Sequence, residues 1–172
     1  VSSGYAAVAQ DKGQTAAAAL ASESQSALQT LYGTVELAKL LGPRAQANLV
    51  FPTVTKPGRG IGGQYAAGSL LKNGAAVAYY KTTGASFGLQ AGGQQYGYAM
   101  FFMNAKALED FVSASGYEVG VGPSVVVVDE GMAKTTTTTT LKGDIYAFVF
   151  GQKGLMAGLG IQGNKIAKIT PK

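Results

Sequence analysis

The chain has 172 residues, a length typical of one compact domain that can bury a core of its own. It contains no cysteine and no histidine, which excludes cysteine nucleophiles, serine–histidine catalytic pairs and metal sites built from thiolates or imidazoles. Its 14 basic and 9 acidic residues give a net charge of +5, but no basic run is long enough to follow a nucleic-acid backbone, so we predict no nucleic-acid partner.

The N-terminal part, residues 14–41, predicts two helices. Residues 14–32 are rich in alanine and place their apolar side chains near one helical face, whereas residues 1–13 are expected to be flexible. Thr34 is predicted to cap a second, short helix through Leu41, which Gly42 and Pro43 end. No stretch of the chain reaches the ~20 apolar residues that a membrane-spanning helix needs.

Residues 47–170 predict a β-rich body, because short segments of β-branched and aromatic residues alternate with glycine-containing turns. The predicted strands cover residues 48–51, 68–71, 75–83, 86–90, 96–103, 117–122, 124–129, 134–141, 144–150, 155–161 and 165–169. Asn73-Gly74 is the clearest signal for a hairpin turn. Residues 125–128 are valine at every position, which is typical of a strand buried on both faces.

One more helix interrupts these strands over residues 105–115. Asn104 is predicted to cap it and Gly116 to end it. The short connections around Gly151 and Gly163 favour antiparallel neighbours. The sequence therefore predicts a single α+β domain over residues 1–172, in which N-terminal helices are followed by a curled or closed, mostly antiparallel β-sheet with one inserted helix.

Two segments, residues 58–63 and 158–163, match the G-x-G-x-x-G pattern of dinucleotide-binding loops. Such a loop needs a helix that begins near the third glycine, because the helix N-terminus binds the pyrophosphate. Gln64-Tyr65 and Asn164-Lys165 follow here, and neither predicts a helix. We interpret these glycines as strand residues that allow a bend or a close contact, and we predict no cofactor.

The candidate catalytic patterns are weak. Ser69 and Lys72 match S-x-x-K, but on a predicted strand residues three apart face opposite sides. The adjacent carboxylates Glu109-Asp110 and Asp129-Glu130 diverge for a similar reason. We predict no catalytic residue and no metal site; a hydrolase that uses Asp129, Glu130 or Asp144 with water stays an alternative, since sequence does not place these carboxylates in space.

Basic residues beside predicted turns form the candidate binding site: Lys56, Arg59, Lys72, Lys81, Lys142 and Lys153. If several gather at one end of the sheet, each would contribute about 1 kcal/mol toward an anionic membrane surface. Ordinary solubilising charge is the alternative interpretation. The threonine run at residues 135–140 is interpreted as a polar edge strand, with water or head-group binding as its alternative.

Several longer segments carry a family resemblance. They are LVFP (49–52), GRGIGGQY (58–65), YYKTTGASFGLQAG (79–92), MFFM (100–103), VGPSVVVVDEG (121–131) and LKGDIYAFVFGQKGLMAGLGIQG (141–163). In this order, over about residues 36–170, the chain closely resembles the SYLF lipid-binding domain family. This family occurs in bacterial secreted or lipid-anchored proteins, in Src-homology-3 proteins of the actin cortex and in plant FYVE proteins.

The resemblance implies a non-enzymatic domain that binds phospholipids, and phosphoinositides in eukaryotic members. An N-terminal amphipathic helix assists membrane binding in those members; residues 14–32 match its position but contain no lysine or arginine. Without a Src-homology-3 domain beside it, the chain resembles the bacterial branch, which implies the cell envelope, periplasm or outer membrane. In that branch a lipidated cysteine often precedes the domain, and whether one precedes Val1 stays open. Anionic phospholipids are the expected partners. The alternative is a structural or protein-interaction module whose protein partner is unknown.

Overall fold

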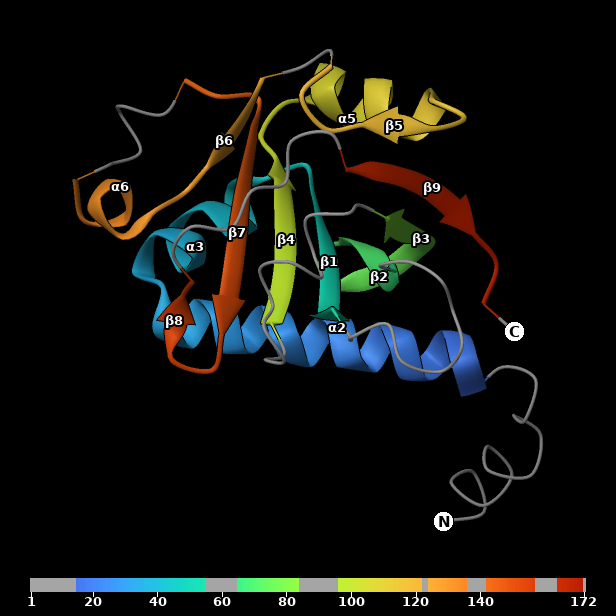
Figure 1. Cartoon of the computed structure of the whole chain (residues 1–172), viewed down its shortest axis with the longest axis horizontal. Coiled ribbons are helices and arrows are strands. Elements are labelled where there is room, and N and C mark those ends of the chain that lie inside the picture. The colour runs from blue at the N-terminus through green and yellow to red at the C-terminus, as the bar shows by residue number, and fades with distance from the viewer. Residues whose placement is uncertain are drawn as a thin grey trace.

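The computed structural model describes residues 15–54, 65–83, 96–121, 124–135, 142–156 and 164–171. It confirms the predicted α+β architecture: N-terminal helices are followed by a strongly curled, half-barrel sheet with an inserted helix (Figure 1). The helices are α2 (Thr15–Thr34), α3 (Glu36–Leu41), the 3-10 helix η1 (Gly42–Arg44), α5 (Ala105–Ser113) and α6 (Glu130–Thr135).

The strands form one sheet in the order β5-β9-β3-β2-β1-β4-β7-β6, with β8 paired to β7. Their bounds are β1 (Ala47–Val54), β2 (Tyr65–Lys72), β3 (Ala75–Thr83), β4 (Tyr96–Phe102), β5 (Tyr117–Glu118), β6 (Val125–Val127), β7 (Ile145–Gly151), β8 (Gly154–Leu155) and β9 (Lys165–Ile169). Within the described residues every pairing is antiparallel except β6 with β7.

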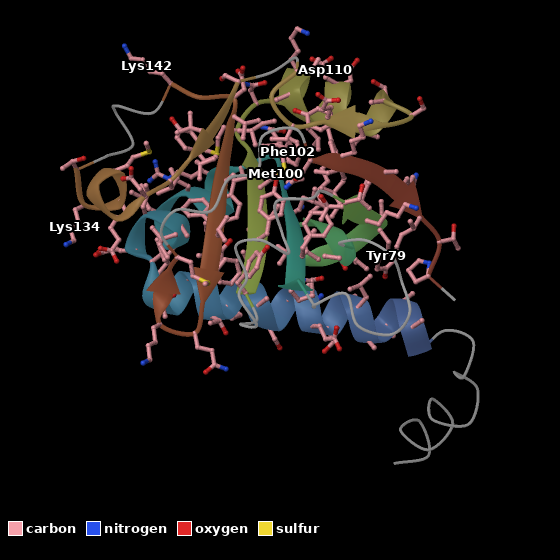
Figure 2. All side chains as sticks on the ribbon, viewed as in Figure 1. Tyr79, Met100, Phe102, Asp110, Lys134 and Lys142 are labelled. Carbon is pink, nitrogen blue, oxygen red and sulfur yellow. The ribbon has the colours of Figure 1, made fainter. Side chains whose placement is uncertain are left out.

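Both faces of the central strands are covered, so β4 is buried along its whole length. Met100 and Phe102, both labelled in Figure 2, belong to the inner-face core. Phe111 of α5 joins the same core. Phe101 points to the outer face, where Leu31 of α2 packs against the same cluster. Alternate side chains of the strand therefore belong to two different cores. Helix α5 covers the inner core, and α2 covers the outer one.

The long helix α2 lies across the outer face and is attached there by a buried polar contact. Ser24 donates a hydrogen bond to Ser69 Oγ over 2.9 Å, which satisfies a hydroxyl that has no exposure to solvent. The predicted cap by Thr34 is wrong. The Thr34 hydroxyl donates to the carbonyl of Thr30, so α2 continues through Thr34, and α3 starts after an extended Val35 without a side-chain cap.

The hairpin between β2 and β3 is confirmed. Asn73 and Gly74 both have positive φ, 56° and 84°, as a two-residue turn that matches the twist of the flanking strands requires. Gln25 of α2 donates to the Gly74 carbonyl over 2.8 Å, so the long helix also holds this turn.

The region around β6 differs from the prediction in two ways. β6 is a half-buried edge strand parallel to β7, not a strand buried on both faces, because it has a neighbour on one side only. The strand predicted from residue 134 is also wrong at its start: α6 occupies Glu130–Thr135, and Asp129 accepts a hydrogen bond from Met132 N, 2.8 Å, as a helix cap does. The rest of the threonine run lies outside the described residues.

Two other predicted strands are shorter than expected, and a third lies outside the described residues. The strand expected over 117–122 is only the two-residue β5, and of the strand expected over 155–161 only Leu155, at the end of β8, is described as β-structure. The strand expected over 86–90 lies outside the described residues.

The inserted helix α5 is capped as predicted, since Asn104 Oδ1 accepts a hydrogen bond from Ala107 N over 2.8 Å. Asn104 Nδ2 also donates to Asp144 Oδ1 over 2.9 Å, and Asp144 Oδ2 accepts from both the backbone and the hydroxyl of Ser124 at 3.1 Å. The bond from Asn104, with that from the Ser124 backbone, holds the pKa of Asp144 below its ordinary value. Asp144 therefore joins α5, β6 and β7 at one point.

Replacing Asp144 with asparagine is expected to lower the free energy of unfolding by about 1 kcal/mol at neutral pH, a modest value because the carboxylate is partly exposed. Since the folded-state pKa is depressed, this stabilisation is present above the unfolded-state pKa of about 3.9 and is lost as the pH falls through the folded-state pKa. Urea denaturation over a pH series would measure it. A difference that does not change with pH would contradict it, and Glu109→Gln on α5 provides an exposed control.

Candidate functional site

The structure describes four of the six predicted lipid-binding residues. Lys72 ends β2, Lys81 lies within β3, Lys142 precedes β7, and Lys153 lies in the turn between β7 and β8. All four side chains are exposed. Lys56 and Arg59 lie outside the described residues.

The four described lysines do not form one cluster. A row of paired residues crosses the sheet through Leu71, Asn48, Phe101 and Tyr146. Lys72 and Lys142 lie at this end of their strands, whereas Lys153 follows β7 at the opposite end. Lys81 is on β3, three strands away from β4. Turn position alone therefore did not predict which cations share a surface.

These lysines are nevertheless free of carboxylate partners. Among the described residues the one ion pair joins Lys106 and Asp110, at 3.1 Å on the exposed surface of α5. Six of the nine acidic residues lie between positions 109 and 144: Glu109, Asp110, Glu118, Asp129, Glu130 and Asp144. Lys142, labelled in Figure 2, is two residues from Asp144. Its backbone N–H donates to Tyr146 Oη. Lys153 is outside this acidic part of the chain.

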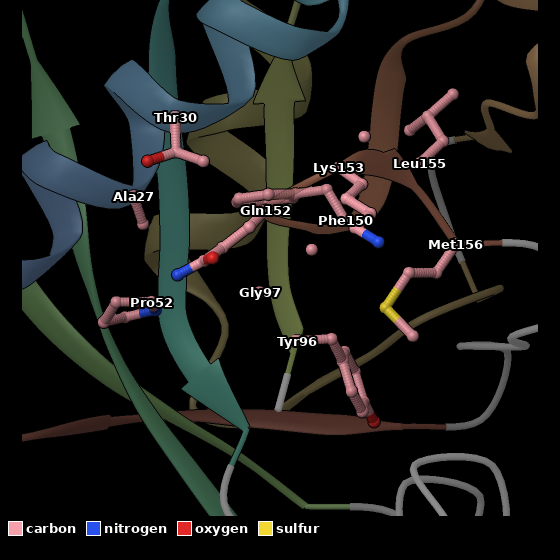
Figure 3. A pocket seen from close by; sticks show the side chains of 12 residues that line it. Ala27, Thr30, Pro52, Tyr96, Gly97, Phe150, Gln152, Lys153, Leu155 and Met156 are labelled. Atoms are coloured by element: carbon pink, nitrogen blue, oxygen red, sulfur yellow. The ribbon is translucent and has the colours of Figure 1, made fainter. Parts of the chain in front are cut away.

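Lys153 stands at a pocket of about 660 Å³ between α2, the start of β4 and the β7–β8 hairpin, which we call the α2 pocket (Figure 3). The residues that line it are Ala27, Thr30, Pro52, Tyr96, Gly97, Phe150, Gly151, Gln152, Lys153, Gly154, Leu155 and Met156. Lys153 is the one charged residue among these, and none of them is acidic. Sequence reasoning identified Lys153 but not the pocket, since its walls come from segments far apart in the chain.

Two glycines shape the strands around the α2 pocket. At Gly97 an added Cβ would lie 2.7 Å from the ring of Phe150, so the absence of a side chain lets this ring lie against β4. The β7–β8 turn is tight because Gly154 takes a φ of 122°, and Met156 N then returns to Val149 O over 2.8 Å. Burial raises the pKa of Tyr96 to about 12.

A second, smaller hollow of about 390 Å³ lies over β9 and includes Lys81. Ala167 pairs with Lys81, and Lys165 pairs with both Thr83 and Glu118, so the hollow holds two cations and one carboxylate. Sequence reasoning missed Lys165 because it considered cations beside turns. The alternating pattern of Lys165–Ile169 was the signal that could have placed it on the face opposite the buried Ile166.

Two of the carboxylates considered for hydrolysis, Asp129 and Asp144, accept hydrogen bonds that hold elements of the fold in place. Asp129 caps α6, and Asp144 accepts three hydrogen bonds. In the described part of the chain no three acidic side chains come together as metal ligands would. No described helix combines the length and the apolar character that crossing a membrane requires.

A family model described as "Las17-binding protein actin regulator", named Ysc84, matches residues 83–170. These 88 residues are just over half of the 172 in the chain. They run from the last residue of β3 to the residue after β9 and include the β7–β8 hairpin beside the α2 pocket. No curated protein matches the chain. The chain belongs to the SYLF family, which the Ysc84 model represents.

Proposed function

We propose that this domain binds phospholipids, that anionic head groups are what its exposed lysines engage, and that it catalyses no reaction. One observation carries the proposal: the predicted lysines that the structure describes are exposed and have no carboxylate partner. An unpaired cation can meet an external anion without first breaking an internal ion pair. Membership of the SYLF family supports the same proposal. The bacterial cell envelope, in the periplasm or at the outer membrane, is the location we propose with it.

Lys153 is the residue that we propose contributes most. It lies beside Leu155 and Met156, so a head group that reaches the ammonium has apolar side chains next to it. Lys142 carries the same charge but lies two residues from Asp144, and the nearby carboxylates repel an anionic surface. The two lysines therefore form a matched pair, one away from the acidic part of the chain and one within it.

Lys153→Glu is expected to weaken binding to anionic vesicles about 30-fold. The substitution changes the charge by two units, and each unit is worth about 1 kcal/mol near the surface. The matched variant Lys142→Glu is expected to weaken it less than about threefold. Co-sedimentation with phosphatidylglycerol vesicles measures both, with phosphatidylcholine vesicles as the neutral control. Wild-type binding should fall as salt rises from about 0.1 M to about 1 M and the screening length drops from ~10 Å to ~3 Å. Equal binding to neutral vesicles at high salt would overturn the electrostatic proposal.

A protein-interaction module is the second candidate, and the description of the matched family favours it, since that description names a binding partner for its members. For this chain the partner is unknown. Recovery of a stoichiometric protein partner together with an absence of binding to any vesicle would support this candidate against the first.

A further inference from the structure

The α2 pocket has the dimensions and the lining of a site for one small amphiphile. Its volume of about 660 Å³ lies within the ~300–1,000 Å³ of pockets that hold small ligands. It differs from a surface patch of lysines, because its walls come from α2, β1, β4 and the β7–β8 hairpin. A head group at a bilayer surface needs no such enclosure.

Several side chains in the pocket lining are apolar. Tyr96 and Phe150 are buried, and their rings form part of the wall. Met156 lies near Tyr96 in Figure 3, with its thioether directed toward the pocket. Methionine is unbranched and polarisable, so it adapts to the shape of a flexible hydrocarbon chain. A lipid tail that packs against these side chains removes its apolar surface from water.

The mouth of the pocket is polar and positively charged. Gln152 and Lys153 come from the tip of the β7–β8 hairpin and are exposed, and in Figure 3 the Gln152 amide extends toward Pro52 across the opening. Lys153 is the one charged residue in the lining that the structure describes, so the pocket favours an acidic group at the mouth. Apolar side chains beside a single cation are complementary to an acyl chain with an anionic end.

We propose that the α2 pocket binds one acyl chain of an anionic amphiphile, with the carboxylate or phosphate of the ligand at Lys153 and the chain along Tyr96, Phe150 and Met156. This inference rests on the proposed lipid-binding function and names the site and the part of the lipid that enters it. The chain can come from a free single-chain amphiphile or from a phospholipid in a bilayer, and the experiment below separates the two sources.

The first test uses the wild-type protein and monomeric alkanoates below their micelle concentration. Isothermal titration calorimetry with octanoate, decanoate and dodecanoate is expected to show affinity rising about fourfold for each additional CH₂ that is buried. Lys153→Gln is expected to weaken decanoate binding about fivefold and to leave decanol, which has the same chain and no charge, unchanged. Affinity that does not depend on chain length would overturn the proposal, and this series needs no variant to fold.

The second test fills the pocket. Ala27→Trp places a large ring in the lining, whereas Ala18→Trp adds the same ring to an exposed position of α2 outside it. Circular dichroism checks that both variants fold. Ala27→Trp is expected to abolish decanoate binding, and Ala18→Trp is expected to leave it unchanged. Decanoate binding that survives in a folded Ala27→Trp variant would overturn the proposal.

Vesicle binding by Ala27→Trp identifies the source of the chain. A parallel loss of phosphatidylglycerol vesicle binding supports a chain drawn from the bilayer, and unchanged vesicle binding supports a free amphiphile. If the wild-type protein binds vesicles but no monomeric alkanoate, the pocket assignment fails while the proposed function stands. If it binds neither, both fail.

Discussion

Replacement of Gly68 by alanine is expected to lower the free energy of unfolding by about 3 kcal/mol or more, because β1 and β2 approach each other too closely there for a side chain. An added Cβ would collide with the backbone carbonyl oxygen of Val50 and would lie 2.6 Å from Cδ1 of Phe51. A backbone atom in a paired strand cannot move aside without breaking the pairing. Phe51 is also fixed, since its ring stacks on Tyr98 at 5.4 Å.

Gly33→Ala is the matched control for this prediction. Gly33 is exposed near the end of α2, and an added Cβ there meets nothing within 4 Å. Alanine has a higher helix propensity than glycine. This variant is therefore expected to be as stable as the wild type or more stable by up to about 1 kcal/mol. Urea denaturation followed by circular dichroism compares the two. A Gly68→Ala variant with wild-type stability would show that the strands can separate at this point.

Truncation of Phe111 to alanine is expected to cost about 3–5 kcal/mol, the usual range for a phenylalanine removed from a core. The side chain is 1% exposed, and its ring centroid lies 4.7 Å from Tyr80, 4.9 Å from Phe102 and 5.1 Å from Tyr117. Together with Ala107 and Leu108, it packs α5 against the inner face of the sheet. Its removal leaves a cavity among three aromatic rings that belong to different strands.

Val112 provides the control on the same helix. It is the next residue and is 48% exposed, so Val112→Ala is expected to change stability by less than about 0.5 kcal/mol. Thermal or urea denaturation measures both variants. Equal effects at the two positions would contradict the assignment of α5 as the cover of the inner core.

Features that depend on neighbouring residues were predicted well. Asn73-Gly74 formed the expected turn because only a residue pair that tolerates positive φ fits there, and Asn104 capped α5 because its side chain reaches the backbone three residues on. Thr34 is the exception among local signals. Its hydroxyl had two possible partners, and the preceding turn of α2 offered a carbonyl at 2.9 Å.

The antiparallel pairing around Gly151 was predicted, but the environment of β6 and the helix that follows it were not. Four valines indicated a central strand, but β6 is at the edge and parallel to β7, since its position follows from the path of the chain between them. Threonines favour strands by propensity, yet Asp129 and the chain reversal after β6 place α6 there as far as Thr135. Propensity is a weak signal when a cap and a crossover act against it.

By itself, the sequence determined the α+β class, the Asn73-Gly74 turn, the Asn104 cap, the absence of cysteine and histidine chemistry, and the family. These follow from residue types and short spacings, which are the same whatever the chain contacts later. Only the tertiary structure decided that Lys153 stands at a pocket while Lys72 and Lys142 lie at the other end of the sheet. The reason is physical: strand register and the placement of α2 bring Ala27, Tyr96 and Met156 together, and no local pattern encodes a contact between residues so distant in the chain.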